Sequence, residues 1–405
     1  MYDVIVVGAR CAGAATAMLL AQAGHRVLLV DRARFPSDTP STHYIHQPGL
    51  VHLHRWGLLE KVLATGCPSL TRARIHAPGA RLTGPAPTLG AVTGGCAPRR
   101  HILDHILIRA AIRAGAEFRP RTTVLDLHRQ DGAITGIVHG TRHAKQYVER
   151  AHLVVGADGR NSTVARLARA PYLQQDPELT YTYYTYWSGL PDQGLRLYLT
   201  QGAGTLCLPT HDNLTLVGLA FSRSDGPVAN HDRQRAYLDR VRRTSPELQQ
   251  QLADAHQEEP LFCCADQPNF FRHAHGPGWT LVGDAAHTKD PISAKGITDA
   301  FIQADMLADH LNIPLDDHHL VTKALTRYAQ QLPRDFTAAY QRTLLAARMD
   351  INRYHQEMID KQHDPTYLDR YLRTYAGMLE PTPSPADCGR QAPRAPAITV
   401  ENKDS

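Results

Sequence analysis

The sequence predicts an α/β protein that begins with a parallel sheet and adds a second, antiparallel sheet and C-terminal helices. Residues 4–7 and 27–30 are two short aliphatic runs, which are typical of parallel strands buried on both faces. Between them, the alanine-rich residues 14–23 favour a helix, and Gly24 ends it. This order of strand, turn, helix and strand is that of a Rossmann-like dinucleotide-binding unit.

The turn between the first strand and the helix carries the pattern G-x-R-x-x-G, in which Arg10 stands at the usual position of the middle glycine. Gly8 permits a tight turn, and Gly13 permits close packing of the helix on the strand. The helix N-terminus presents free N–H groups to a pyrophosphate. Asp31, at the end of the second strand, can accept hydrogen bonds from ribose hydroxyls. The residues predicted to bind the dinucleotide here are Gly8, Arg10, Cys11, Ala12, Gly13, Asp31 and Arg32.

Composition excludes several classes of function. The chain has 405 residues, 42% of them hydrophobic and 20% charged, which is enough for two folded domains. A net charge of +5 without a basic block interleaved with aromatics predicts no nucleic-acid partner. Because no apolar run is long enough to span a membrane and the N-terminus lacks signal-peptide features, a cytoplasmic protein without a membrane anchor is expected. The seven cysteines form no C-x-x-C pair, so no metal site is expected.

The middle of the chain alternates between the two kinds of sheet. Residues 99–114 favour a helix, and residues 124–150 favour a small meander of three strands. Residues 152–155 read as a separate buried strand that returns to the parallel sheet. Residues 178–221, which are rich in Tyr, Thr and Leu, favour antiparallel strands.

Helices dominate the last part of the chain. Residues 231–256 and 318–379 have helical periodicity with charged outer faces, and a further helix is expected over residues 296–311. The predicted boundaries are residues 1–65, 99–170 and 276–345 for the nucleotide-binding domain, 66–98 and 171–275 for the substrate domain, 346–380 for C-terminal helices and 381–405 for a tail expected to be disordered.

Two further motifs follow predicted buried strands. Residues 156–159 read Gly-Ala-Asp-Gly, and Gly283-Asp284 follows the strand at residues 279–282. Pro291 stiffens the next loop, and Gly296 opens a helix whose positive N-terminus would stabilise an anionic group. Because the carboxyl ends of parallel strands meet at one edge of a sheet, the three motifs are expected to form one site.

Together the three motifs resemble those of flavoprotein monooxygenases of the p-hydroxybenzoate hydroxylase type, over roughly residues 1–345. Geranylgeranyl reductases and flavin-dependent halogenases share this scaffold. The resemblance implies FAD as cofactor and NAD(P)H as electron donor. It implies that Arg100 contacts the FAD phosphate or ribityl oxygens and that Asp284 binds the ribityl chain. The other residues that it places on the cofactor are Asp158, Gly159, Gly283, Pro291, Lys295, Gly296 and Ile297.

The scaffold alone does not fix the reaction. Halogenases carry a lysine after the second strand and a W-x-W-x-I-P motif, whereas this chain has no lysine in residues 35–40 and reads TLCLP at residues 205–209. Of the Y-x-W-x-F-P-K stretch typical of reductases, only Pro209 is present. A monooxygenase is therefore favoured, which uses NAD(P)H and O2 through a flavin C4a-hydroperoxide to oxygenate a small, partly aromatic metabolite.

Several alternatives stay open. The loop with Asp290-Pro291 resembles reductase and halogenase loops as much as hydroxylase loops, so a reductase that saturates a C=C bond is the main alternative. A flavin oxidase or dehydrogenase is the next, a halogenase is less favoured, and a non-catalytic flavin-binding protein is disfavoured. A separate flavin reductase partner and a homodimer through the C-terminal helices are also left open.

Residues beyond the cofactor motifs are assigned by position and chemistry. His43 and His46 lie in the loop that reaches toward the flavin in this family, and either could donate or relay a proton. Pro291 and Lys295 complete the predicted catalytic set. Tyr186, on an aromatic strand, is a predicted substrate contact, and packing within a core explains it equally well. Arg196 and Tyr198 share a face of the next strand and are predicted to bind an anionic or phenolic group of the substrate, and solvent exposure explains them at least as well.

Overall fold

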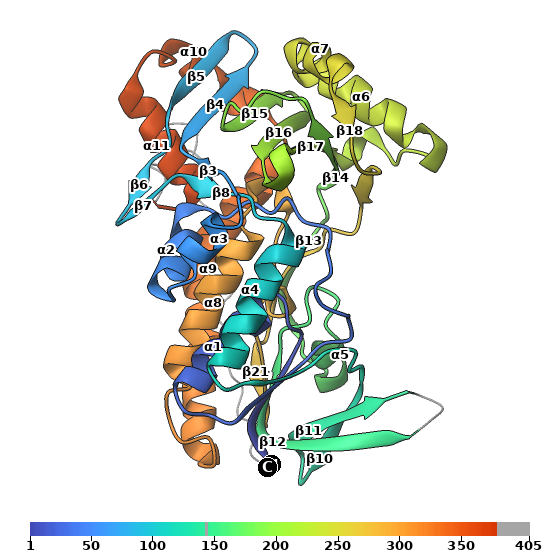
Figure 1. Cartoon of the computed structure of the whole chain (residues 1–405), viewed down its shortest axis with the longest axis vertical. Coiled ribbons are helices and arrows are strands. Elements are labelled where there is room, and N and C mark those ends of the chain that lie inside the picture. Colours follow the sequence, from blue (N-terminus) through green and yellow to red (C-terminus); the bar gives the residue numbers. More distant parts are fainter. Residues whose placement is uncertain (142–144, 379–405) are drawn as a thin grey trace, which may run out of the picture.

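The computed structural model describes residues 1–141 and 145–378 of the chain. The predicted tail, residues 381–405, lies outside these residues. The molecule is elongated, with the small meander at one end and a second sheet, flanked by helices, at the other (Figure 1). Within the described residues, no helix is both long and apolar enough to cross a membrane.

A parallel sheet forms the nucleotide-binding part, as the sequence predicts. Its strands run in the order β9-β2-β1-β12, with β22 beside β12. The aliphatic runs form its centre because the sheet buries them on both faces. The bounds are Tyr2–Val7 (β1), Val27–Val30 (β2), Glu117–Arg119 (β9), Gln146–Gly156 (β12) and Trp279–Leu281 (β22).

The meander differs from its prediction at one point. β10 (Val124–Gln130) and β11 (Ala133–Gly140) form as expected, but the third strand and the returning strand are one continuous strand, β12. Its polar first half pairs antiparallel with β11, and its buried second half pairs parallel with β1. The change from polar to aliphatic residues within β12 is what made the sequence pattern suggest two strands.

Helices α1 (Cys11–Gln22), α4 (Arg100–Arg113) and α8 (Gly296–His310) pack together beside the parallel sheet, and α9 (His318–Ala347) lies against α8 (Figure 1). The alanines of α1 are buried, so small side chains allow this close packing. α2 begins at Gln47, earlier than the periodicity from residue 50 suggests, because Pro48 is compatible with a first helical turn. Two short helices complete this part, Leu59–Leu63 (α3) and Thr163–Ala168 (α5).

The second sheet is largely antiparallel. Its order is β18-β14-β17-β16-β15-β4-β5, with β19 paired to β14 and one parallel pair between β15 and β4. That pair brings two strands from the first hundred residues into the sheet. The bounds are Arg72–Ala77 (β4), Ala80–Pro85 (β5), Thr180–Ser188 (β14), Leu195–Thr200 (β15), Ala203–Pro209 (β16), Thr215–Ser222 (β17), His256–Gln257 (β18) and Phe262–Cys264 (β19).

Both long helical predictions are interrupted in the structure. Residues 231–256 form α6 (Arg233–Thr244) and α7 (Pro246–Asp254), because Ser245 is extended and its side chain caps α7. After α9, Met349 has a left-handed backbone, and α10 (His355–Asp360) follows as a separate helix. The side chain of Asp364 caps the start of α11 (Pro365–Ala376). α10 and α11 pack against β5 (Figure 1).

Short strands connect the two parts. β13, β20 and β23 form a three-stranded sheet, and two hairpin-like pairs lie between α3 and α4 in the chain. The bounds are Ser69–Leu70 (β3), Thr88–Leu89 (β6), Val92–Thr93 (β7), Gly95–Cys96 (β8), Tyr172–Asp176 (β13), Asn269–Arg272 (β20), His275–Gly276 (β21) and His287–Thr288 (β23).

Candidate functional site

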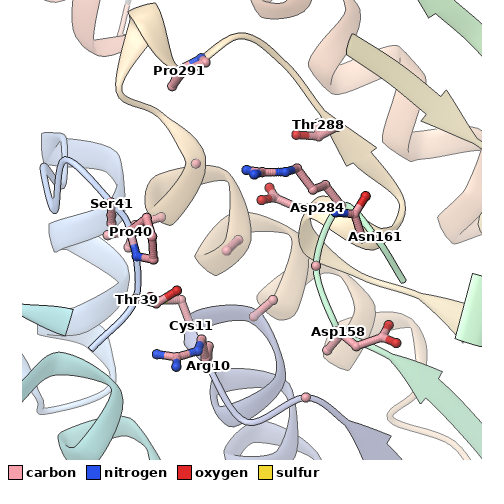
Figure 2. Close-up of a pocket in the computed structure, with 18 of the residues that line it drawn as sticks. Arg10, Cys11, Thr39, Pro40, Ser41, Asp158, Asn161, Asp284, Thr288 and Pro291 are labelled. Atoms are coloured by element: carbon pink, nitrogen blue, oxygen red, sulfur yellow. The ribbon is translucent and has the colours of Figure 1, made fainter. Parts of the chain in front are cut away.

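A cavity of about 730 Å³ opens at the carboxyl ends of the parallel strands, where open α/β sheets bind ligands (Figure 2). Segments that are far apart in the sequence meet around it. The sequence-predicted residues that line it are Gly8, Arg10, Cys11, Ala12, Asp31, Arg32, Arg100, Asp158, Gly159, Asp284, Pro291, Lys295, Gly296 and Ile297.

Glycines let three backbone segments meet at the floor of the cavity. Gly8 has φ +102°, and a Cβ on it would lie 2.5 Å from the carbonyl oxygen of Ala157. A Cβ on Gly13 would lie 1.8 Å from the carbonyl oxygen of Gly8, and one on Gly283 would lie 2.7 Å from the Cβ of Ala12. Gly13 and Gly283 do not line the cavity. They permit the packing that presents the N-terminus of α1 to it.

Asp31 ends β2 with a carboxylate that the backbone holds in place. Its Oδ2 accepts a hydrogen bond from Ala9 N at 2.8 Å, and its Oδ1 accepts one from Ala33 N at 2.7 Å. Each oxygen retains lone-pair capacity for a further donor. The carboxylate is therefore positioned to accept hydrogen bonds from the hydroxyls of a ribose.

Arg10 and Arg100 share one buried carboxylate, which sequence reasoning missed. Asp104 is fully buried on α4 and lies 2.7 Å from Arg10 Nη1 and 3.1 Å from Arg100 Nη2. Burial raises the pKa of the Cys11 thiol, so it stays protonated and donates to Asp104 at 3.4 Å. Two cations and one anion leave net positive charge beside the α1 N-terminus. An acid four residues after Arg100 was the available signal in the sequence.

Asp158 lines the cavity with its backbone, while its carboxylate has a local role. The carboxylate accepts hydrogen bonds from Thr163 N at 2.7 Å, Val164 N at 3.2 Å and the Ser162 hydroxyl. In Figure 2 it points away from the centre of the cavity. Asp158 therefore fixes the shape of its loop at the start of α5.

Asp284 points into the cavity from the 3-10 turn Gly283–Ala285 (Figure 2). Its side chain is accessible only through the cavity, which reaches deep into the protein. The many protein atoms around it desolvate the carboxylate and raise its pKa to about 6, and Arg160 and Arg100 oppose this rise. At neutral pH the carboxylate is ionised and accepts hydrogen bonds.

The loop before α8 forms the far end of the cavity. Asp290 accepts hydrogen bonds from Ile292 N at 3.0 Å and from the Thr180 hydroxyl at 2.8 Å, which fixes the turn Pro291–Ser293. Burial raises the pKa of Asp290 to about 6. A Cβ on Gly296 would meet nothing within 4 Å, so the α8 N-terminus is open to a ligand.

Two lysines on this loop are held by other parts of the chain. Lys289 pairs with Asp299 of α8. Lys295 is 7% exposed, and its Nζ would lie 2.7 Å from a Cβ on Gly377, directly after α11. The Lys295 ammonium group therefore packs against the end of α11.

His43 and His46 lie behind the cavity wall. The His43 ring bonds to the Tyr186 hydroxyl, and His46 Nε2 donates to the Ser293 carbonyl at 3.0 Å. Burial lowers the pKa of each to about 3, so both rings are neutral at physiological pH. This arrangement suits a hydrogen-bond relay, whereas it does not suit a charged imidazolium acid.

Tyr186, predicted as a substrate contact, also lies behind the wall. Its ring packs under the Arg99 guanidinium, with 4.0 Å from Arg99 Cζ to the ring centroid. Arg99 in turn pairs with Asp38 at 2.8 Å and Glu259 at 2.7 Å. These contacts tie the loop before α2 to the second sheet.

The structure does not bring Arg196 and Tyr198 to the cavity. Both are buried on the face of β15 that α6 and α7 cover, and Arg196 Nη1 donates to Gln251 of α7 at 2.9 Å. Side chains alternate along a strand, so Leu195 and Leu197 face the opposite side. Neither residue lines this cavity, so their predicted contact with substrate stays a prediction.

A second group of lining residues lies outside the predicted site residues. They come from the loop before α2, the loop after β12, β14, the end of β19 and the segment after it. Alternation along β14 was the one available signal, since Thr182 and Tyr184 share a face with Tyr186. These residues include Thr39, Pro40, Ser41, Thr42, Tyr44, Arg160, Asn161, Thr182, Tyr184, Cys264 and Gln267.

The geometry is that of a dinucleotide site, and comparison with known proteins identifies its class. Residues 1–331 match the family described as FAD binding domain. The chain belongs to this family. It is 30% identical over 324 residues to 6-methylpretetramide 4-monooxygenase of Streptomyces rimosus, covering 76% of this chain and 74% of the relative. It is 26% identical over 376 residues to digeranylgeranylglycerophospholipid reductase of Methanocella arvoryzae, covering 90% and 89%.

Solved structures share the fold at low identity. The flavin-dependent brominase Bmp2 superposes with a TM-score of 0.76 at 18% identity, covering 94% of each chain. PqsL, a probable FAD-dependent monooxygenase from Pseudomonas aeruginosa, has a TM-score of 0.69 at 20% identity and covers 92% of this chain and 99% of its own. This FAD-binding family member is therefore an FAD-dependent oxidoreductase with the Rossmann-like fold that the sequence predicts.

Gly13→Ala is expected to disrupt the floor of the cavity, because its Cβ would overlap the Gly8 carbonyl. We expect a loss of about 1–3 kcal/mol in the free energy of unfolding and a severalfold lower flavin content after purification. Gly204→Ala is the matched control, since its Cβ would meet its nearest neighbour at an ordinary 3.6 Å. Equal flavin content in the two variants would contradict the role of Gly13.

Asp290 should make stability depend on pH. Its pKa of about 6 in the folded protein exceeds its ordinary value of 3.8, so folding favours the protonated form. The stability of the wild type relative to Asp290→Asn should therefore fall by about 2–3 kcal/mol as pH rises from about 4 to 6, and then stay constant. Urea denaturation across this range measures the difference. The exposed Asp254→Asn is the control, and a pH-independent difference for Asp290→Asn would refute the assignment.

Proposed function

We propose that this FAD-binding family member is a monooxygenase that takes electrons from NAD(P)H and oxygenates a small, partly aromatic metabolite. The observation that carries the proposal is one continuous cavity along which the three motifs lie from Asp31 to Pro291. The relative from Streptomyces rimosus, whose name describes a monooxygenase, supports the choice of reaction.

The residues present fit FAD. Asp31 would accept hydrogen bonds from the adenosine ribose, and the α1 N-terminus with Arg100 would neutralise the pyrophosphate. Asp284 would accept hydrogen bonds from the ribityl hydroxyls, since its carboxylate is open to the cavity. The backbone at residues 295–297 would face the flavin pyrimidine ring.

When bound, FAD supplies the redox chemistry by accepting a hydride from NAD(P)H and reducing oxygen. The protein provides the surroundings. The N-terminal dipole of α8 stabilises negative charge at its end of the cavity. Pro291 and the loop with Ser41, which donates from its backbone N to the Tyr184 hydroxyl at 3.0 Å, enclose the same end and limit water.

A reductase that saturates a C=C bond is the second candidate. The reductase relative from Methanocella arvoryzae aligns over more of the chain than the monooxygenase does, 90% against 76%. We keep the monooxygenase first because the Streptomyces rimosus relative has the higher identity. A cytoplasmic location, a homodimer and a partner flavin reductase stay predictions.

Product analysis under labelled oxygen distinguishes the two reactions. The purified yellow protein would be incubated with NADH or NADPH, ¹⁸O₂ and a panel of hydroxylated aromatic metabolites. A monooxygenase gives a product that is heavier by one ¹⁸O atom. An unlabelled product heavier by two hydrogens would instead identify a reductase. Anaerobic mixing with NADH and NADPH, which bleaches the flavin only if it is reduced directly, tests the need for a partner reductase.

A further inference from the structure

Two cysteine thiols lie together outside the cofactor cavity. All six cysteines of the described residues are free thiols. Cys67 precedes β3, and Cys96 ends β8. These two strands pair antiparallel with Ser69 opposite Cys96, so Cys67 lies only two residues from the pairing partner of Cys96 (Figure 1). The side chains of Cys67 and Cys96 are hydrogen bonded to each other, and neither residue lines the cofactor cavity.

This hydrogen bond gives the two sulfur atoms different roles. The Cys67 sulfur accepts from the Cys96 thiol and from the backbone at Ala97. These donors lower the pKa of Cys67 although burial opposes them, whereas burial raises the pKa of the Cys11 and Cys207 thiols. Because the thiolate is the form that reacts with oxidants, Cys67 is suited to react first, and Cys96 is already in position to react with it.

Burial restricts the oxidants that can reach the pair. Cys67 is 4% exposed, and Cys96 is fully buried. Hydrogen peroxide is small and neutral enough to meet this restriction, whereas a protein or glutathione disulfide is not. Reoxidation of a reduced flavin by oxygen releases hydrogen peroxide. The pair lies near that source, because Tyr44 lines the cofactor cavity and a Cβ on Gly95, next to Cys96, would lie 2.5 Å from the Tyr44 hydroxyl.

We propose that Cys67 and Cys96 form a reversible disulfide when the enzyme meets hydrogen peroxide. The Cys67 thiolate attacks one peroxide oxygen, the O–O bond breaks, and the hydroxide that leaves takes up a proton to become water. Cys67 is then a sulfenic acid. The Cys96 sulfur attacks the Cys67 sulfur, the S–O bond breaks, and a second water leaves with the Cys96 proton. Two thiols are oxidised to one disulfide, and one peroxide is reduced to two waters.

The disulfide anchors β8, which supports one wall of the cofactor cavity. Ile45 N donates to the Cys96 carbonyl at 2.8 Å, and Cys96 N donates to the Ile45 carbonyl at 3.3 Å. Ile45 directly follows Tyr44, a residue of that wall. The bond between Cys67 and Cys96 therefore ties the segment after α3 to the loop before α2. Because it joins segments that already pair, it forms without rearrangement of the fold and stabilises the protein by constraining the unfolded chain.

Mapping of the disulfide in the FAD-loaded protein tests the proposal. The reduced, desalted protein would be exposed to a few equivalents of hydrogen peroxide, or photoreduced and then mixed with oxygen, and treated with N-ethylmaleimide. We expect two of the seven thiols to escape alkylation and the tryptic peptides 62–72 and 82–99, which contain Cys67 and Cys96, to be linked until dithiothreitol is added. The Tm of the oxidised protein should be higher by about 2–4 °C.

Serine variants separate this pair from the other cysteines. Cys67→Ser and Cys96→Ser should each abolish the linked peptides and the rise in Tm, and if one of them does not retain flavin, the other is judged by the same criteria. Cys263→Ser is the matched control, because it breaks up the adjacent cysteines Cys263 and Cys264. This variant should retain both the linked peptides and the rise in Tm.

Three results would overturn the proposal. The first is the absence of linked peptides with either source of peroxide. The second is linkage only after the protein is unfolded in urea, which would show that the native pair is inert. The third is linkage that dithiothreitol does not reverse or that leaves the Tm unchanged. The oxidation needs no substrate, so its outcome is independent of whether the enzyme proves to be a monooxygenase or a reductase.

Discussion

The close backbone packing around Gly8 is the constraint on which the site depends. The first turn, the start of α1 and the loop after β12 meet there at distances that leave no room for side chains. The 3-10 turn Gly283–Ala285 joins them through Gly283, which lies against Ala12 of α1. This packing converts separate strand ends into one continuous floor, with the N-terminus of α1 directed at the ligand.

The buried charges of Arg10, Arg100 and Asp104 are paired with one another beside that floor. Asp104 lies between Arg10 and Arg100, which explains how an arginine can replace the middle glycine of the usual pattern. The Arg10 side chain turns toward Asp104 and lies over the Phe35 ring, with 5.3 Å from its Cζ to the ring centroid. The shared carboxylate therefore moderates the positive charge beside the α1 N-terminus instead of cancelling it.

Local sequence signals were enough for the parallel sheet and for the lining residues that belong to motifs. The signals for a strand, a turn glycine or a helix start lie within a few consecutive residues. The sequence therefore indicated Gly8, Asp31 and Asp284, and all three line the cavity. The features that local signals leave open depend on contacts between distant segments. Arg196 could have faced either side of its strand, and only the packing of α6 and α7 decides which. β12 was divided in two because its two halves have different neighbours.

The same contrast between local signals and distant contacts separates the cofactor-binding residues from the residues that line the rest of the cavity. Cofactor binding needs backbone geometry, which motifs specify, and the same scaffold therefore occurs in relatives named as monooxygenases and as reductases. Lining residues outside the motifs, such as Ser41 of the loop before α2 and Thr182 of β14, come from segments that only tertiary packing brings together. Because tertiary packing alone brings these side chains together, they can diverge without disturbing the cofactor floor. Substrate choice is therefore expected to depend on the segments that line the cavity outside the motifs, whereas cofactor binding depends on the packing around Gly8.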